Sequence, residues 1–223
     1  RTSTVMQLPA VSALVQDQRE GNTNTWFYSA GEFFGNSASI TGAFYLGDGI
    51  FKSTDGGLSW TVIPSTTQND NTNLGDFGLI GEIIIDNSNT AVREMYAARL
   101  GNIVRTTDDF ATYTTVLGAN NTGFSYTDVA ISSTGMLIAT IANNVNNGPN
   151  AQEGIYKSED GLTWININPP SGLPSSYERI EVAFDPQNED VFYAVGTSFL
   201  LKHTISTGEW VNLTGNLGVS TDS

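Results

Sequence analysis

The amino-acid sequence predicts an all-β fold of the β-propeller type, and three observations lead to it. Short stretches rich in β-branched and aromatic residues alternate with turns rich in glycine, asparagine and serine. None of these stretches shows a convincing 3.6-residue period. A related segment recurs along the chain at a spacing that holds four short strands, which is the content of one propeller blade. We therefore expect four blades of four antiparallel strands each.

The recurring segment fixes the register of the repeat. Its clearest copies are GIFKSTDGGLSW at 49–60 and GIYKSEDGLTW at 154–164, the second being one residue shorter in the turn. Weaker copies begin at Asn102 and Phe199. Each copy carries one cation at the same place, and successive cations are 53, 52 and 45 residues apart: Lys52, Arg105, Lys157 and Lys202. A period of this length is typical of propeller blades.

Each expected blade has the same order of elements. A short apolar strand ending in a polar turn comes first, and a strand rich in aromatic and small residues follows it. The recurring segment then supplies the third strand, a tight turn and the fourth strand. We predict one propeller domain, or the N-terminal part of one, over 1–223, with blades at about 5–64, 74–118, 124–169 and 177–213.

The turn of the recurring segment has the chemistry of a locked hairpin. A short carboxylate, Asp55 or Asp160, can accept hydrogen bonds from N–H groups of its own turn, and the glycine tolerates a positive φ. The tryptophan ring can cover the base of the hairpin. We predict a structural role, without catalysis, for eight residues: Ser53, Asp55, Gly57, Trp60, Asp108, Ser158, Asp160 and Trp164.

The octet 53–60 resembles the Asp-box, also called the BNR repeat, of the form Ser-x-Asp-x-Gly-x-Thr/Ser-Trp. The run Gly172-Leu173-Pro174 and the segment 180–194, with Asp-Pro-Gln-Asn in its turn, resemble blades of exported bacterial BNR-like propellers, sortilin-type receptors and xyloglucanase-type glycoside hydrolases. Such propellers usually have more than four blades. The resemblance therefore implies that the chain is part of a larger propeller, and the alternative is a closed four-bladed ring.

Composition excludes several classes of function. The chain has 9 Lys and Arg against 23 Asp and Glu, a net charge of −14, which disfavours binding to nucleic acid or to anionic lipid headgroups. It has no cysteine, so a disulfide scaffold, a thiolate metal site and a cysteine nucleophile are excluded. No apolar run is long enough for membrane insertion. An acidic, lysine-poor chain rich in Asn, Thr and Ser suits a secreted or cell-surface location, which we expect to be bacterial.

Three acids hold equivalent places in the first strands, which line the central channel of a propeller: Glu82, Asp128 and Glu181. They can pair with backbone N–H groups or water, they can hold Ca²⁺, or two of them can act as a catalytic pair in a complete propeller. Beyond Ca²⁺ no cofactor is indicated.

Aromatic residues lie in the loops of the face where propellers usually bind ligands, and they include Tyr126 and Tyr177 beside Phe33, Phe34, Phe44, Tyr45 and Phe124. Aromatic rings among amide side chains suit a neutral glycan or a protein surface, and they equally suit plain loop packing.

Catalysis finds little support in the sequence. Sialidase chemistry needs an arginine cluster, and only Arg99 and Arg179 could approach the ligand face. The single histidine, His203, stands at the place of Ser53 in the eroded copy, where we expect a surface or turn residue. We therefore expect an exported or cell-surface module for binding or adhesion, without catalysis. The alternatives are a xyloglucanase-type hydrolase whose site is incomplete in this segment, and a structural subunit of a surface assembly.

Overall fold

The computed structural model describes residues 10–31, 46–70, 74–119, 125–142, 152–173 and 179–217. Over these ranges the chain is all-β, with two short 3₁₀ turns at Pro64–Thr66 and Thr214–Asn216. Sixteen strands form four antiparallel sheets of four. The strands of blade 1 are β1 (Val11–Gln16), β2 (Trp26–Ala30), β3 (Ile50–Ser53) and β4 (Thr61–Val62); those of blade 2 are β5 (Ile80–Asp86), β6 (Glu94–Arg99), β7 (Asn102–Thr106) and β8 (Thr114–Leu117); those of blade 3 are β9 (Thr127–Ile131), β10 (Leu137–Ile141), β11 (Gly154–Ser158) and β12 (Ile165–Asn166); those of blade 4 are β13 (Ile180–Phe184), β14 (Val191–Gly196), β15 (Phe199–Thr204) and β16 (Glu209–Asn212). The predicted all-β fold with four four-stranded sheets is confirmed.

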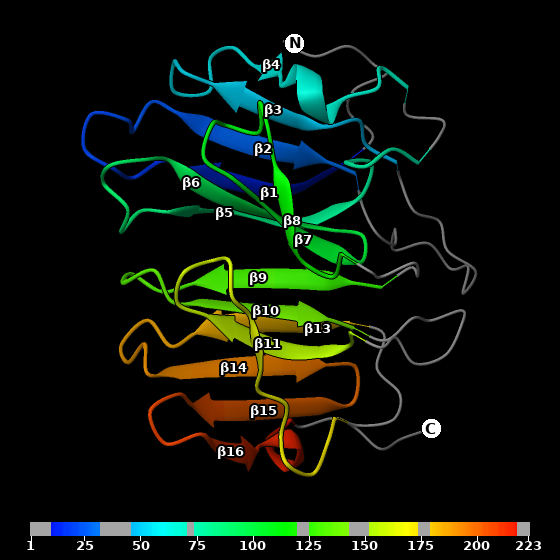
Figure 1. Ribbon diagram of the computed structural model, residues 1–223, viewed down its shortest axis with the longest axis vertical. Helices are drawn as coiled ribbons and strands as arrows, with labels where there is room; N and C mark the ends of the chain where they lie inside the picture. Colours follow the sequence, from blue (N-terminus) through cyan, green and yellow to red (C-terminus); the bar gives the residue numbers. More distant parts are fainter. Residues whose placement is uncertain are drawn as a thin grey trace.

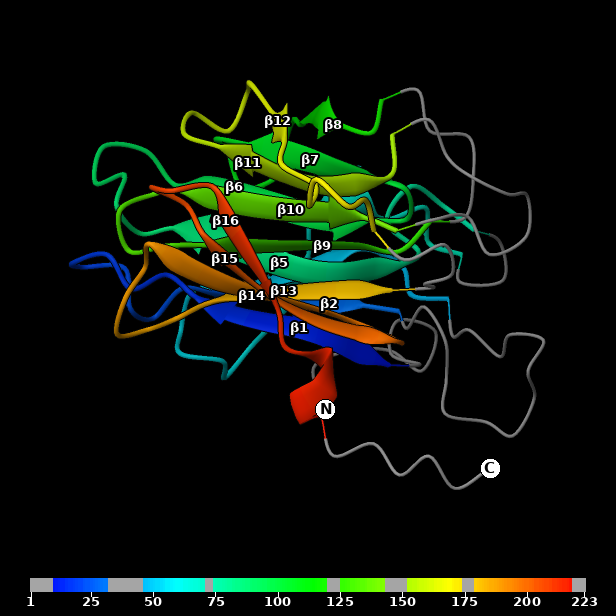
Figure 2. The same ribbon diagram turned by 90° about the horizontal axis from the view of Figure 1, so that it is seen from below.

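The four blades follow one another along an arc. Their first strands β1, β5, β9 and β13 are neighbours in that order, and the later strands of each blade extend outward (Figures 1 and 2). Blades 1 and 4 point in opposite directions at the two ends of the arc (Figure 1). On the face of blade 4 that points away from blade 3, Val195 and Val211 are 39% and 37% exposed. The described blades thus form an open arc, as in part of a larger propeller.

The core lies between the blades, because successive residues of a strand point to opposite faces of its sheet. In β6, Met95 packs toward blade 1, whereas the next residue, Tyr96, packs toward blade 3. In β10, Leu137 packs toward blade 2 and Ile138 packs toward blade 4. Three apolar clusters therefore fill the three blade junctions, and each middle blade contributes to two of them.

A network of ion pairs joins blades 1 and 2 at the hairpin end of the strands. Asp17 is fully buried, and its carboxylate accepts from Arg19 Nη2 at 2.8 Å and from Arg93 Nε at 2.6 Å. Arg93 Nη1 also lies 2.7 Å from the carboxylate of Asp109, and Asp109 forms a second ion pair with Lys52 Nζ at 2.7 Å. Burial alone would raise the pKa of Asp17, but the hydrogen bonds from Arg19 and Arg93 hold it at about 2. The carboxylate is therefore ionised and fully paired.

The third-to-fourth-strand hairpins of blades 1 to 3 share one hydrogen-bond pattern. Ser53 Oγ donates to Asp55 Oδ1 at 2.7 Å, and the same Asp55 oxygen accepts the backbone N–H of Ser59 at 2.9 Å. In blade 2, Thr106 and Asp108 make the equivalent pair, at 2.8 Å. In blade 3, Asp160 Oδ1 accepts from Ser158 Oγ and from two backbone N–H groups. Each turn therefore has its own carboxylate acceptor, and in blade 1 Trp60 Nε1 donates to Gly57 O at 3.0 Å across the hairpin base.

The turn of blade 3 carries a glycine at the point where it comes closest to blade 2. Gly161, at φ +68°, approaches blade 2 so closely that a Cβ atom there would lie 1.6 Å from the Tyr96 hydroxyl oxygen. That hydroxyl donates to Glu94, which also accepts from Arg105 Nε at 2.7 Å. Only glycine combines this backbone conformation with this close approach.

The prediction that His203 is a surface or turn residue is wrong. His203 lies in β15 and is 4% exposed, with its ring 4.3 Å from that of Trp210 and 5.1 Å from that of Phe192. The ring faces blade 3 in the register of the core residues, and burial lowers the pKa of His203, so it packs as a neutral aromatic.

Replacing Asp17 by Ala should destabilise the fold by about 3 to 5 kcal/mol, because it removes the fully buried carboxylate that pairs with the partly buried guanidinium groups of Arg19 and Arg93. Urea unfolding monitored by tryptophan fluorescence measures the loss. The matched control is Glu20→Gln in the same loop, where the side chain is exposed and a change below about 0.5 kcal/mol is expected. Equal stabilities of Asp17→Ala and the control would contradict the role of this network.

Replacing Asp160 by Ala should lower the melting temperature, because the N–H groups of Leu162 and Thr163 lose their acceptor. The neighbouring exposed residue provides the control, Glu159→Ala, for which we expect little change. Thermal unfolding followed by circular dichroism compares the two variants. Unchanged melting together with a lost binding activity would show that Asp160 acts on a ligand instead.

Candidate functional site

The structure brings the three predicted acids onto one wall. Glu82, Asp128 and Glu181 lie in the innermost strands β5, β9 and β13, which are neighbours in the arc. Glu82 follows a bulge in the pairing of β5 with β6, between Ile80 and Glu82, and such a bulge re-aims the side chains next to it. We call these three acids, with Arg179 and Tyr126, the channel-wall group.

Asp128 is the most deeply placed of the three acids, at 7% exposure. Its Oδ2 accepts the backbone N–H of Val182 at 2.8 Å, so this carboxylate joins blade 3 to blade 4. Burial raises the pKa of Asp128 to about 7, and the charges of Glu181 and Glu82 add to the increase, while the Val182 N–H opposes it. Asp128 therefore changes its protonation state near neutral pH.

The other two acids also have partners within the chain. Glu82 is partly buried and accepts the backbone N–H of Ile83 at 3.0 Å; burial raises its pKa against that hydrogen bond. Glu181 forms an ion pair with Arg179, and these side chains are 45% and 56% exposed. The Arg179–Glu181 pair is thus the accessible part of the channel-wall group.

The aromatic residues predicted for the ligand face have different outcomes. Tyr126 directly precedes β9 and is 8% exposed, with the Arg179 guanidinium carbon 5.8 Å from its ring centre. It therefore supports Arg179 and offers little free ring surface. Tyr177, like Phe33, Phe34, Phe44, Tyr45 and Phe124, lies outside the described residues.

The described residues do not fit a Ca²⁺ site. Over these ranges no three His, Asp or Glu side chains are gathered closely enough to hold a metal ion. The channel-wall acids contribute neighbouring charges without converging on one point, whereas Ca²⁺ takes six to eight oxygen ligands in proteins.

Sequence reasoning missed two features of the polar structure. The ion-pair network around Asp17 joins residues up to 76 positions apart, and nothing in the local sequence marks it. Arg99, considered for the ligand face, is instead buried at 6% exposure, with its guanidinium carbon 4.8 Å from the Phe77 ring centre and 5.3 Å from that of Tyr113. Because the Arg99 guanidinium group packs on these two aromatic rings, Arg99 contributes to packing and does not face a ligand.

The raised pKa of Asp128 predicts a specific pH dependence of stability. Its carboxyl ionises near pH 4 in the unfolded chain and near pH 7 in the folded chain, so stability falls as the pH rises between these values. In Asp128→Asn the amide oxygen can still accept from Val182, and this part of the pH dependence disappears. Melting temperatures from pH 5 to 8 should therefore decline less steeply in Asp128→Asn than in the wild type. Parallel curves for the two proteins would contradict the prediction.

No protein-family model matches the chain, and no curated protein sequence is significantly similar to it. Solved structures do match in fold. A GH74 enzyme from Niastella koreensis matches at a TM-score of 0.56 and 19% identity, covering 91% of this chain and 38% of that one. The GH74 xyloglucanase from Xanthomonas campestris matches at 0.58 and 16%, covering 93% and 38%. An auxiliary nutrient binding protein from Bacteroides thetaiotaomicron VPI-5482 matches at 0.50 and 12%, covering 92% and 41%.

The chain spans about two-fifths of the length of each of these structures. At such identities the similarity is one of fold, and it agrees with four blades as part of a larger β-propeller. The described part of the chain contains no helix that is long and apolar enough to cross a membrane.

Proposed function

We propose that the chain is part of an exported or cell-surface propeller of the Asp-box type that binds a glycan or a protein surface and has no catalytic activity. One observation carries the proposal: each channel-wall acid is already engaged within the chain. Asp128 accepts from Val182, Glu82 accepts from Ile83, and Glu181 pairs with Arg179.

Glycoside hydrolysis needs two carboxyl groups that flank the scissile bond, roughly 5 to 10 Å apart across a cleft. The three acids here belong to neighbouring strands of one wall, and each already accepts a hydrogen bond or pairs with a cation of the chain. An accessible arginine beside a carboxylate can instead donate to and accept from the hydroxyl groups of a sugar or the backbone of a peptide. This arrangement suits recognition.

The Asp-box assignment is supported by the hydrogen bonds that recur in the hairpins of blades 1, 2 and 3. The secreted or cell-surface location, in a bacterium, is supported by the composition. One protein of similar fold is an auxiliary nutrient binding protein, and this role agrees with a binding module.

A xyloglucanase-type hydrolase is the second candidate, and Asp128 favours it. A carboxyl group whose pKa lies near 7 can act as a general acid at neutral pH. Its partner carboxylate would have to come from elsewhere in a complete propeller.

A glycan array, followed by hydrolysis assays on xyloglucan and other β-glucans, tests the proposal. We expect binding to a defined glycan group without turnover. Arg179→Gln should weaken that binding about tenfold, the effect of losing one hydrogen bond to a charged group. Lys202→Gln, an equal loss of charge on blade 4 away from the channel wall, should leave it unchanged. Turnover that Asp128→Asn abolishes would overturn the proposal and establish the hydrolase.

A further inference from the structure

The cations that recur in the four copies of the motif, Lys52, Arg105, Lys157 and Lys202, allow the charge pairing at one blade junction to be compared with that at the others. Each of the first three points from the third strand of its blade toward the next blade. Lys52 Nζ lies 2.7 Å from Asp109, which stands in the hairpin turn of blade 2. Arg105 Nε lies 2.7 Å from Glu94, which begins the second strand of its own blade. A repeated cation is therefore neutralised from one of two positions, the next hairpin or the start of its own second strand.

Lys157, at the junction of blades 3 and 4, has an acid at neither position. Strand register places Lys157 opposite Ile138 as Arg105 lies opposite Tyr96, so Met136 occupies the place of Glu94. In blade 4 the hairpin turn at 205–208 contains no acid. The nearest carboxylate among the described residues is that of Glu159, 4.0 Å from Nζ and 74% exposed. Lys157 thus lacks the close counter-charge that its two counterparts have.

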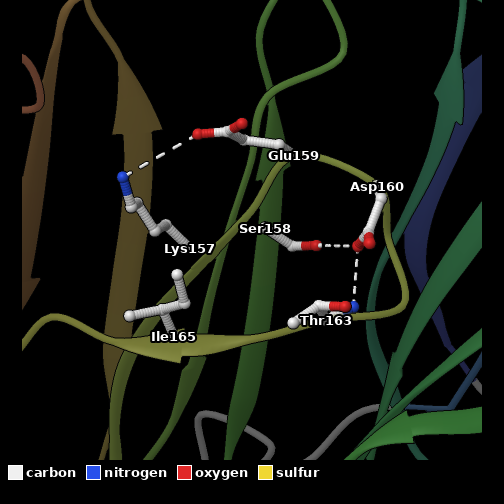
Figure 3. A pocket seen from close by; sticks show the side chains of 6 residues that line it. All are labelled: Lys157, Ser158, Glu159, Asp160, Thr163 and Ile165. Carbon is white, nitrogen blue, oxygen red and sulfur yellow. Dashed lines mark hydrogen bonds and ion pairs between the residues drawn. The ribbon is translucent and has the colours of Figure 1, made fainter.

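A pocket opens at this ammonium group. It has a volume of about 340 Å³ and is lined by Lys157, Ser158, Glu159, Asp160, Thr163 and Ile165 (Figure 3). Ile165 is 55% exposed and gives the pocket an apolar side. In Figure 3 the Asp160 carboxylate turns toward Ser158 and Thr163 of its own hairpin, away from Lys157. The hydrogen bonds from Thr163 and Leu162 hold the pKa of Asp160 at about 2, so its charge is compensated within the turn.

We propose that this pocket binds an acidic sugar of the uronic acid type, with its carboxylate on Lys157. The carboxylate takes the place that Asp109 and Glu94 hold at the other two junctions. The exposed carboxylate of Glu159 and the hydroxyl of Thr163 pair with sugar hydroxyls, and Ile165 packs against the carbon face of the ring. This site lies at the hairpin end of blade 3, apart from the channel-wall group, and is independent of the proposed function above.

The test is NMR titration of the backbone amide signal of Thr163, which lines the pocket and is present in every variant, in the intact chain with glucuronate, glucose and acetate as probes. Glucuronate should shift the signal in a saturable way that weakens with added salt, and glucose should not. Lys157→Gln should reduce glucuronate affinity about tenfold or more. Lys202→Gln, which removes the equivalent cation of blade 4, should change it by less than about twofold.

A second variant keeps the test independent of the loss of Lys157. Met136→Glu places an acid where blade 2 has Glu94, so it should pair with Lys157, raise the melting temperature and abolish glucuronate binding. Met136→Gln is its uncharged control and should do neither. Acetate binding as tight as that of glucuronate would overturn the sugar assignment, and tighter binding of a short oligoglutamate would replace it with an acidic peptide. No saturable shift with any probe would overturn the site altogether.

Discussion

Every other feature of this structure depends on the face-to-face packing of neighbouring sheets. A four-stranded blade is apolar on both faces, and alone it would leave both in water. Met95 and Tyr96 adjoin in sequence, yet they serve different junctions, so blade 2 is held from both sides. The same packing places the first strands side by side, and this is why acids that are about 50 residues apart in the chain share one wall.

Each junction adds its own polar chemistry to this shared packing. Blades 1 and 2 are joined by the buried Asp17 and its arginines, and blades 2 and 3 by the contact of Gly161 with Tyr96. Between blades 3 and 4, Trp210 donates from Nε1 to Ile167 O at 3.0 Å, and His203 packs beside Trp210. Apolar burial supplies the general affinity, while these contacts distinguish one junction from another.

The features that the sequence could predict are those that repeat or that are local. Four blades follow from the recurring segment, and the hairpin bonds of Asp55 and Asp160 follow from the residue types within a single turn. The shared wall of Glu82, Asp128 and Glu181 follows from their equal places in the repeat. The partner of Asp128 could not be predicted, because Val182 meets it from another blade.

The burial of His203 was missed for a related reason. His203 aligns with Ser53 of the hairpin motif, but the fourth copy of this motif has lost the hairpin chemistry. The His203 ring packs instead against the aromatic rings of Phe192 and Trp210. The sequence likewise left ligand contact and packing open for Tyr126, whereas in the structure it is 8% exposed, with the Arg179 guanidinium carbon 5.8 Å from its ring centre. The contact of Tyr126 with Arg179 joins residues 53 positions apart, whereas the rings around His203 lie in the two strands that pair with β15.

The Gly161–Tyr96 contact has a consequence for how such a chain can evolve. Blades look like interchangeable copies, but the position of Tyr96 in blade 2 leaves room only for a glycine at 161, and a turn with a side chain there would collide with it. Duplication or shuffling of single blades would therefore create junctions whose residues do not fit each other. A pair of blades copied together would keep its matching junction. Growth and shrinkage of this propeller by recombination should accordingly proceed in units larger than one blade.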